Sequence, residues 1–469
     1  MVSLRTRVTF CGSAVVLAVA VGCAVKQPPA PATLLPSILP ATTVVPLEWK
    51  AGGSANGAIA TEWLSTFGDP QLEALVNEGL QNNLDLYAAS ARVDVAIALV
   101  AQARALLYPQ LSITSGLGLV GHDEVSDKSG LTGDISWELD LWGRVRAQAA
   151  SATANRQASE ADLSYARQSL AAVVATTWYQ TIASERSRLA AEEAAGMYSD
   201  LLGLVRTRNQ IGQVGAEDVA LASADLDRAR QRERAFATSL QQTSRGLEVM
   251  LGRYPSAEVA LAPDLPPVPA PVPAGLPSGL LERRPDLVAA ERRVAAAFHL
   301  IQVAEAARLP RLALTASGGR STSELLALAG VPAGFWQAGI GMLAPLFTGG
   351  ALQAQVARAS ADQRAALALY GQTALRAFSE VEGALASEQL LADRQSYLES
   401  VLAQDTEAVR LGRLRYDVGA TDLLHVLQLQ GRQLTSRFDL IGIRNDRLAN
   451  RVALHLALGG GFSPPPPAP

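Results

Sequence analysis

The chain has 469 residues, 49% of them apolar, so it can bury a sizeable core and disorder of the whole chain is excluded. Its 40 basic and 44 acidic residues give a formal net charge of −4. It therefore lacks the basic excess that nucleic-acid binding requires, and no nucleic-acid partner is expected.

The N-terminus has the layout of a secretory signal peptide. Two arginines within the first seven residues precede an uncharged apolar run at 8–21 and the small residue Gly22. We therefore expect residues 1–22 to be removed during export. Cys23 would then begin the mature chain, and because Cys11 lies within the signal, an internal disulfide is impossible.

Cys23 is a candidate lipidation site. The residues that end at Cys23 resemble the bacterial lipoprotein box, in which the cysteine is acylated, although an unmodified thiol is the alternative. Each buried methylene of an acyl chain adds about 0.8 kcal/mol, so several chains together would anchor the protein stably. Residues 23–60 contain six prolines between 27 and 46, and we interpret them as a lipidated, Pro-rich tether.

Residues 61–254 combine a helical segment, a pair of strands and long helices. Alternation is strict at 131–141, where apolar side chains stand at odd positions and polar ones at even positions. A looser alternation at 111–119 and a polar loop at 122–130 precede it. We therefore predict a β-hairpin over 111–142 with one apolar and one polar face.

The segment after this hairpin is predicted to be one continuous helix. Residues from Arg144 to about Val205 are rich in Ala, carry charges on one side and contain no turn signals. No proline interrupts the sequence between 110 and 254. At 1.5 Å per residue the helix would be roughly 90 Å long, and its alanines would let neighbouring helices approach closely.

The chain is an internal duplication. Residues 108–111 (YPQL) return as 309–312 (LPRL), 201 positions later. Gly212 returns as Gly419, 207 positions later, and the register is otherwise kept within each copy. Chance similarity would not preserve the spacing over such a length, so the two halves are one unit written twice.

The second copy repeats the order of the first. A Pro-rich connector at 255–284 leads to residues 285–462, which again contain a helical segment, a hairpin at 312–347 and long helices. Residues 463–469 are mostly proline, and we expect a disordered tail there.

Four strands per chain are too few to close a barrel. Each is about as long as a membrane-crossing β-strand, whereas no run of about 20 apolar residues predicts a membrane-spanning helix. Because open sheet edges in lipid leave backbone groups unpaired, oligomerisation is required. Two chains would give a lumen filled by side chains, and three would leave a water path. Asp134, Glu138 and Asp140 would face that lumen and favour cations.

Five motifs, in order along the chain, resemble those of the TolC and OprM type of outer-membrane efflux proteins, and the similarity runs from about Trp63 to Phe462. The motifs are Trp63–Leu72, Asn83–Leu86, Trp137–Arg144, Arg284–Leu287 and Leu456–Gly460. Each is weak alone, but five in order, on a duplicated chain, are a specific signal.

This resemblance implies a mainly α fold with a small transmembrane β portion. Long coiled helices would form an α-barrel tunnel through the periplasm, and trimerisation would complete a 12-stranded β-barrel from four strands per chain. It also implies a homotrimer lipid-anchored in the outer membrane, with a periplasmic adaptor protein and an inner-membrane efflux pump as partners. Neither a cofactor nor a metal is expected.

The resemblance further implies a gate at the periplasmic end of the tunnel, where helix-turn-helix bends carry a tyrosine latch. The corresponding bends are 208–218 and 415–425. Tyr416 falls at the latch tyrosine, and Asp218 falls at its carboxylate partner. The alternative for Tyr416 is a tyrosine that simply packs between helices.

An acidic ring of the gate is less well matched. The family's paired aspartates in the second copy fall at His425 and Gln428. Asp422 could supply such a ring instead, or His425 could make the charge of the aperture depend on pH. A solvated His425 in a helix turn is the alternative.

We therefore predict a passive outer-membrane channel of a tripartite efflux pump that exports drugs or other small toxic molecules. No combination of nucleophile, base or metal ligands indicates an enzyme. A conduit for protein secretion and a non-porous periplasmic coiled-coil scaffold remain the alternatives.

Overall fold

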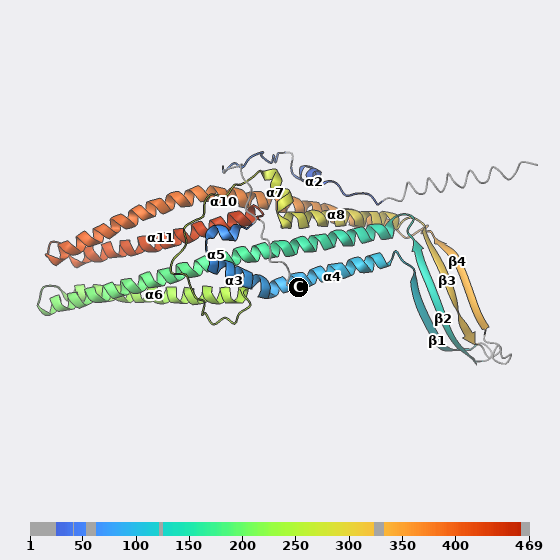
Figure 1. Cartoon of the computed structure of the whole chain (residues 1–469), viewed down its shortest axis with the longest axis horizontal. Coiled ribbons are helices and arrows are strands. Elements are labelled where there is room, and N and C mark those ends of the chain that lie inside the picture. The colour runs from blue at the N-terminus through green and yellow to red at the C-terminus, as the bar shows by residue number, and fades with distance from the viewer. Residues whose placement is uncertain (1–24, 41, 53–61, 122–124, 323–332, 461–469) are drawn as a thin grey trace, which may run out of the picture. The chain divides into compact units, whose positions relative to one another are not determined.

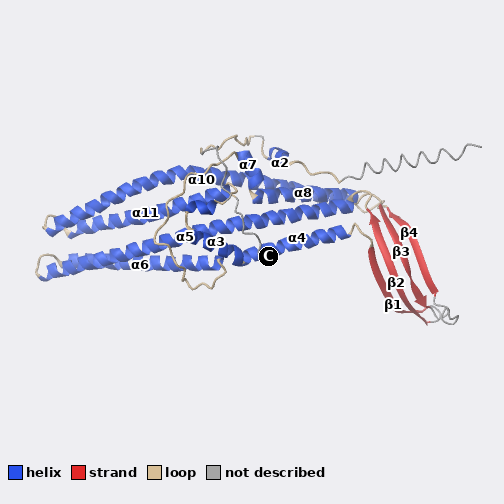
Figure 2. Ribbon diagram, viewed as in Figure 1, coloured by secondary structure: helices blue, strands red, loops and turns tan. Residues whose placement is uncertain are grey.

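A computed structural model describes residues 25–40, 42–52, 62–121, 125–322 and 333–460. Helices account for most of these residues, and four strands form one sheet (Figure 2). Within this part of the chain, no helix combines the length and the apolar character that a membrane span requires.

The described residues fold into two compact units, and each unit takes segments from both copies of the duplication. The first unit contains all four strands, and the second contains the ends of the longest helices. Their ranges are Met1–Thr43, Ser90–Asp162 and Asp286–Thr373 for the first unit, and Val44–Ala89, Leu163–Pro285 and Ala374–Pro469 for the second. The compact units therefore do not coincide with the two copies.

The sheet of the first unit is entirely antiparallel, in the order β1 (Gln110–Gly121), β2 (Val125–Leu139), β3 (Arg311–Thr322) and β4 (Ala333–Leu343) (Figure 1). Residues 125–130 belong to β2, so the prediction that they lie in a loop is wrong. Backbone pairing between β1 and β2 continues as far as Gly121 opposite Val125, beyond the end of the apolar alternation.

The register gives the sheet one apolar and one polar face, because residues directly opposite each other share a face. On the apolar face, Ile135 lies opposite Leu111 on one side and Ala316 on the other. On the polar face, Asp134 lies opposite Ser112 and Ser317. The alternation predicted for the strands is thus confirmed.

The two copies have matching helices. In the first copy α5 (Arg144–Gln210) has 67 residues and α6 (Ala216–Met250) has 35, and in the second α10 (Ala351–Asp417) and α11 (Leu423–Ala457) have the same lengths. At 1.5 Å per residue, α5 and α10 are each about 100 Å long. In each copy the short helix folds back along the long one (Figure 1). The other helices among the described residues are η1 (Trp63–Phe67), α2 (Pro31–Ile38), α3 (Pro70–Asn82), α4 (Leu84–Ala105), α7 (Pro277–Arg283) and α8 (Pro285–Ala306).

The main core of the second unit surrounds η1 and the middle of α5. Trp63 and Trp178 are fully buried in it, and Asp69, the N-cap of α3, accepts a 2.9 Å hydrogen bond from Trp178 Nε1. The end of the Pro-rich segment, near Trp49, packs against the same unit. Trp49 is buried, and its Nε1 donates to the Ala274 carbonyl at 3.2 Å. This part of the predicted tether is therefore packed against the protein.

Candidate functional site at the helix hairpin ends

Each pair of long helices ends in a turn that is built around a glycine. Gly212 and Gly419 have φ values of 77° and 74°, the left-handed region that favours glycine. At both turns the next residue donates a backbone hydrogen bond to a carbonyl in the last helical turn. Gln213 N reaches Arg208 O at 2.9 Å, and Ala420 N reaches Arg415 O at 2.8 Å. The two turns therefore share one backbone design.

The helices that leave the two turns are capped differently. Gly215 is the N-cap of α6, and its backbone N–H donates to Asp218 Oδ2 at 3.1 Å. Asp422 is the N-cap of α11, and its Oδ1 accepts from the backbone N–H of His425 at 2.9 Å. Both carboxylates also lie where the helix dipole favours negative charge.

Tyr416 connects the two hairpins. Its side chain is 5% exposed in a cluster that includes Val205 from α5 and Val426 from α11. The guanidinium carbon of Arg208 lies 4.3 Å from the centroid of the Tyr416 ring, within the range of a cation–π interaction. The hydroxyl of Tyr416 is buried and has no hydrogen-bond partner among the described residues.

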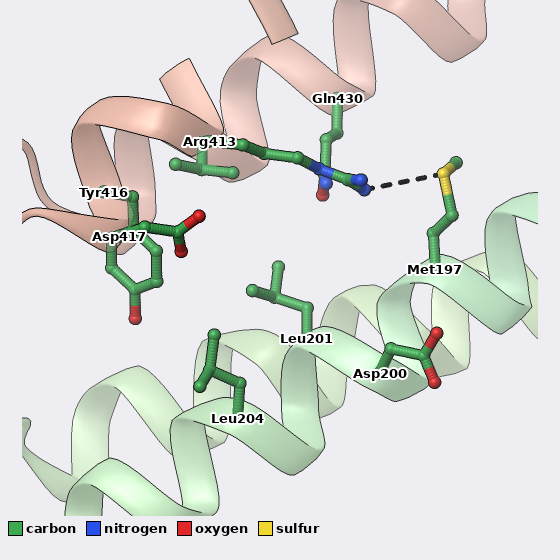
Figure 3. A pocket seen from close by; sticks show the side chains of 9 residues that line it. Met197, Asp200, Leu201, Leu204, Arg413, Tyr416, Asp417 and Gln430 are labelled. Carbon is green, nitrogen blue, oxygen red and sulfur yellow. Dashed lines mark hydrogen bonds between the residues drawn. The ribbon is translucent and has the colours of Figure 1, made fainter. Parts of the chain in front are cut away.

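A pocket of about 230 Å³ lies next to Tyr416, between α5 and the second-copy hairpin (Figure 3). Arg413 extends across it from α10, and its Nη2 lies 3.5 Å from the sulfur of Met197 on α5. With its amide oxygen turned toward Arg413, Gln430 accepts from Nη2 at 2.8 Å and from Nε at 3.1 Å. Asp200 and Asp417 also line the pocket.

The predicted gate residues lie at these hairpin ends, but they do not form one cluster. Tyr416 is buried, whereas Asp422, His425 and Gln428 are exposed on the first turns of α11. Asp218 accepts a hydrogen bond from Gly215 N, and in the described part of the chain no hydrogen bond joins it to Tyr416. The latch therefore stays a prediction.

The predicted lumen carboxylates have different surroundings. Asp134 accepts a long, 3.4 Å hydrogen bond from Thr114, and Glu138 forms a 2.7 Å salt bridge with Arg144. Placing Asp140 on a strand is wrong, because β2 ends at Leu139. Asp140 instead accepts from the backbone N–H groups of Val145 and Arg146, both at 2.9 Å, and so caps α5.

Sequence reasoning missed the residues that join the two hairpins. Arg208 begins the first predicted bend but had no predicted role, and Arg413 and Gln430 belong to no motif. Their contacts join residues that are far apart in sequence or on different helices. Their helical spacing alone gives no signal of a partner. Cys23, the predicted lipidation site, lies outside the described residues. In the described part of the chain, no group of three His, Cys, Asp or Glu residues could hold a metal ion.

The sequence matches a known protein family. The family model described as outer membrane efflux protein matches residues 75–253 and 276–460, which is most of both copies. The chain belongs to the outer membrane efflux protein family.

Individual efflux proteins are similar over nearly the whole chain. The pyoverdine export outer membrane protein OpmQ of Pseudomonas aeruginosa is 32% identical over 444 residues, covering 91% of this chain and 93% of OpmQ. The toluene efflux pump outer membrane protein TtgC of Pseudomonas putida is 30% identical over 452 residues, covering 92% and 93%. The structure of the outer-membrane channel OprN aligns with a TM-score of 0.82 and 28% identity, covering 90% of this chain and 97% of OprN.

These similarities confirm the predicted family, the fold of long helices with four antiparallel strands per chain, the outer-membrane location and the function as an efflux channel. The family consists of channels.

Proposed function

We propose that three copies of the chain form the outer-membrane channel of a tripartite efflux pump. The channel receives small toxic molecules from a periplasmic adaptor protein and an inner-membrane pump and conducts them outward passively, with no covalent step. OpmQ and TtgC are named for pyoverdine and toluene, two chemically different small molecules. We therefore assign small organic molecules as the substrate class.

The unpaired edges of the sheet support the proposal of a trimer. Among the described residues, β1 and β4 each have only one neighbouring strand. The apolar side chains of Leu111, Ile113 and Trp336 are 72%, 73% and 85% exposed in the single chain. Unpaired strand edges in lipid cost several kcal/mol per backbone group, so sibling chains supply the missing partners. Three chains with four strands each would surround a water path.

Crosslinking of the detergent-solubilised protein, followed by conductance measurement in planar bilayers, tests this proposal. We expect crosslinking to stop at three subunits and the purified protein to give discrete, ohmic channel openings. A monomer that does not insert into bilayers would overturn it, and a trimer without conductance would favour a scaffold.

The predicted gate is tested by removing each latch group separately. If Asp218 and Tyr416 hold the hairpin ends closed, Asp218→Ala and Tyr416→Phe should each raise single-channel conductance. Glu217→Ala removes a neighbouring exposed carboxylate and Tyr198→Phe removes a hydroxyl from the same core, so they are matched controls. Unchanged conductance in both latch variants would contradict the gate.

Asp134 is the proposed lumen carboxylate with the weakest internal pairing. Asp134→Asn should reduce cation selectivity, measured as a smaller reversal potential across a KCl gradient. Glu138→Gln should have a smaller effect, because Arg144 already balances that charge. Equal effects of the two variants would contradict this ranking.

The lipid anchor is proposed at Cys23. Intact-mass measurement of the mature protein should show the added mass of acyl chains, and Cys23→Ser should lack it. A mature wild-type protein with an unmodified N-terminus would contradict the anchor while leaving the channel proposal intact.

A further inference from the structure

The first unit contains a pocket that is lined by cations. Its volume is about 440 Å³, and Arg104 from α4, Arg146 from α5 and Arg292 from α8 all line it. No described residue of its lining carries a carboxylate. Gln27 and Pro28, near the start of the described residues, also line it. Its chemistry suits an anion.

The charges around the pocket are only partly balanced from within the chain. Arg146 is paired with Asp140 at 3.0 Å, and Arg292 binds Glu291 through Nε at 3.1 Å. Arg104 is exposed and has no carboxylate partner among the described residues. The guanidinium of Arg104 is therefore available to an external ligand, as are the Nη groups of Arg292.

A buried histidine adds a neutral donor. His299 lines the pocket and is 8% exposed, and burial lowers its pKa, so the ring is neutral near pH 7. The Gln302 amide accepts from Lys26 N at 2.9 Å, which fixes its NH₂ group as the donor to Lys26 O at 3.1 Å and to His299 Nδ1 at 3.3 Å. Since Nδ1 accepts, the proton of His299 is on Nε2, which can donate to a ligand.

The position of the pocket indicates where the anion comes from. Arg104 lies in the last turn of α4, Tyr108 lies between α4 and β1, and Arg146 lies in the first turn of α5 after β2. Tyr108 and Trp142, at the same junction of helices and strands, are 68% and 44% exposed. Such aromatic residues are enriched at the level of lipid headgroups. In sequence, Gln27 is also only four residues from Cys23.

We propose that this pocket binds the phosphate of an anionic glycerophospholipid headgroup, with Arg104 and Arg292 as its charged ligands and His299 as a neutral donor. The choice of a lipid over free phosphate rests on the outer-membrane placement of the sheet in the proposed function. An anionic headgroup is favoured over a zwitterionic one because an ammonium group would be repelled by the arginines.

Binding is measured on the full-length, detergent-solubilised protein by isothermal titration with dihexanoyl-phosphatidylglycerol, dihexanoyl-phosphatidylethanolamine and inorganic phosphate. We expect phosphatidylglycerol to bind at least tenfold more tightly than either alternative. The double variant Arg104→Gln/Arg292→Gln should lose that preference. Arg358→Gln should keep it, because Arg358 is an 83% exposed arginine of the same unit that does not line the pocket.

Equal binding of phosphatidylglycerol to the wild type and the double variant would overturn the site. Phosphate or phosphatidylethanolamine that binds as tightly as phosphatidylglycerol would overturn the assigned ligand. If the double variant does not purify as an oligomer like the wild type, Arg104→Gln alone provides the test. Conductance in planar bilayers is a separate measurement, so failure of the channel proposal and failure of this site can be told apart.

Discussion

Two positions 207 residues apart show how the copies have diverged. Glu248, near the end of α6, and His455, near the end of α11, are both buried. Glu248 accepts hydrogen bonds from Ala257 N at 2.7 Å and Glu258 N at 2.8 Å. Both nitrogens of His455 are buried without a hydrogen-bond partner among the described residues, and its ring stacks on Trp63 at 5.4 Å.

At these two positions the duplication preserved backbone and burial but not the polar contacts. A buried polar group without a partner destabilises the folded state, whereas a satisfied carboxylate does not. Equivalent positions whose polar contacts differ between the copies should therefore respond differently to the same perturbation.

The largest difference is expected at the last turn of the long helices, where Asn209 in α5 corresponds to Tyr416 in α10. Tyr416→Ala should destabilise the protein by about 3 to 4 kcal/mol, because it empties a buried site and removes the contact with Arg208. Asn209→Ala should cost about 1 kcal/mol, because it removes a single 2.9 Å hydrogen bond to Val214 O. Guanidinium unfolding followed by circular dichroism measures both, and equal shifts of the midpoint would contradict the comparison.

The second prediction concerns pH. Burial, and then the charge of Arg451, lowers the pKa of His455 from 6.5 to about 4. Because the folded-state pKa lies below the unfolded value, the folded state resists protonation. Stability is complete above pH 6.5 and is lost as the pH falls toward 4, by at most about 3 kcal/mol.

Replacing the histidine isolates its contribution to that loss. His455→Phe keeps an aromatic ring against Trp63 and removes the titrating group, so its melting temperature should fall less than that of the wild type between pH 6.5 and 4. Glu248 cannot account for a loss of stability that begins near pH 6.5, because the pKa of its carboxyl lies below its ordinary value of 4.5. Burial raises that pKa, but the hydrogen bonds from Ala257 N and Glu258 N lower it by more. If the melting temperatures of the wild type and His455→Phe fell in parallel, groups other than His455 would cause the loss of stability.

The strands and helices whose side chains repeat with a regular period along the sequence were predictable. Side chains alternate between apolar and polar at 131–141, and the sequence after Arg144 is helical without a break. Such patterns identify a strand and a helix because each element places its apolar residues on a regular face. The membership of 125–130 in β2 was not predictable, because it depends on backbone pairing with β1. The contact of Arg208 with Tyr416 was not predictable either, because it depends on the packing of one copy against the other.

The third prediction is an expected equality. Gly212→Ala and Gly419→Ala should each destabilise by about 1 to 2 kcal/mol, because both residues have positive φ and both have open space where the methyl group would lie. Gly431→Ala is the control, since Gly431 lies within α11, also with open space, and should be neutral or stabilising. Thermal unfolding midpoints measure all three. A large difference between the two turns would mean that their backbones are less alike than their hydrogen bonds indicate.

The smallest effect is expected at the helix caps. Asp422→Ala should cost about 1 kcal/mol, because the first turn of α11 loses the acceptor for His425 N. Asp218→Ala should cost less, because Gly215 remains the N-cap of α6 and its exposed N–H can bind water instead.

Asp422→Asn separates the two contributions of the carboxylate. The amide oxygen still accepts the hydrogen bond, so only the interaction of the negative charge with the helix dipole, typically about 0.3 to 1 kcal/mol, is lost. If Asp422→Asn were as damaging as Asp422→Ala in the same unfolding measurement, charge and not the hydrogen bond would stabilise the start of α11.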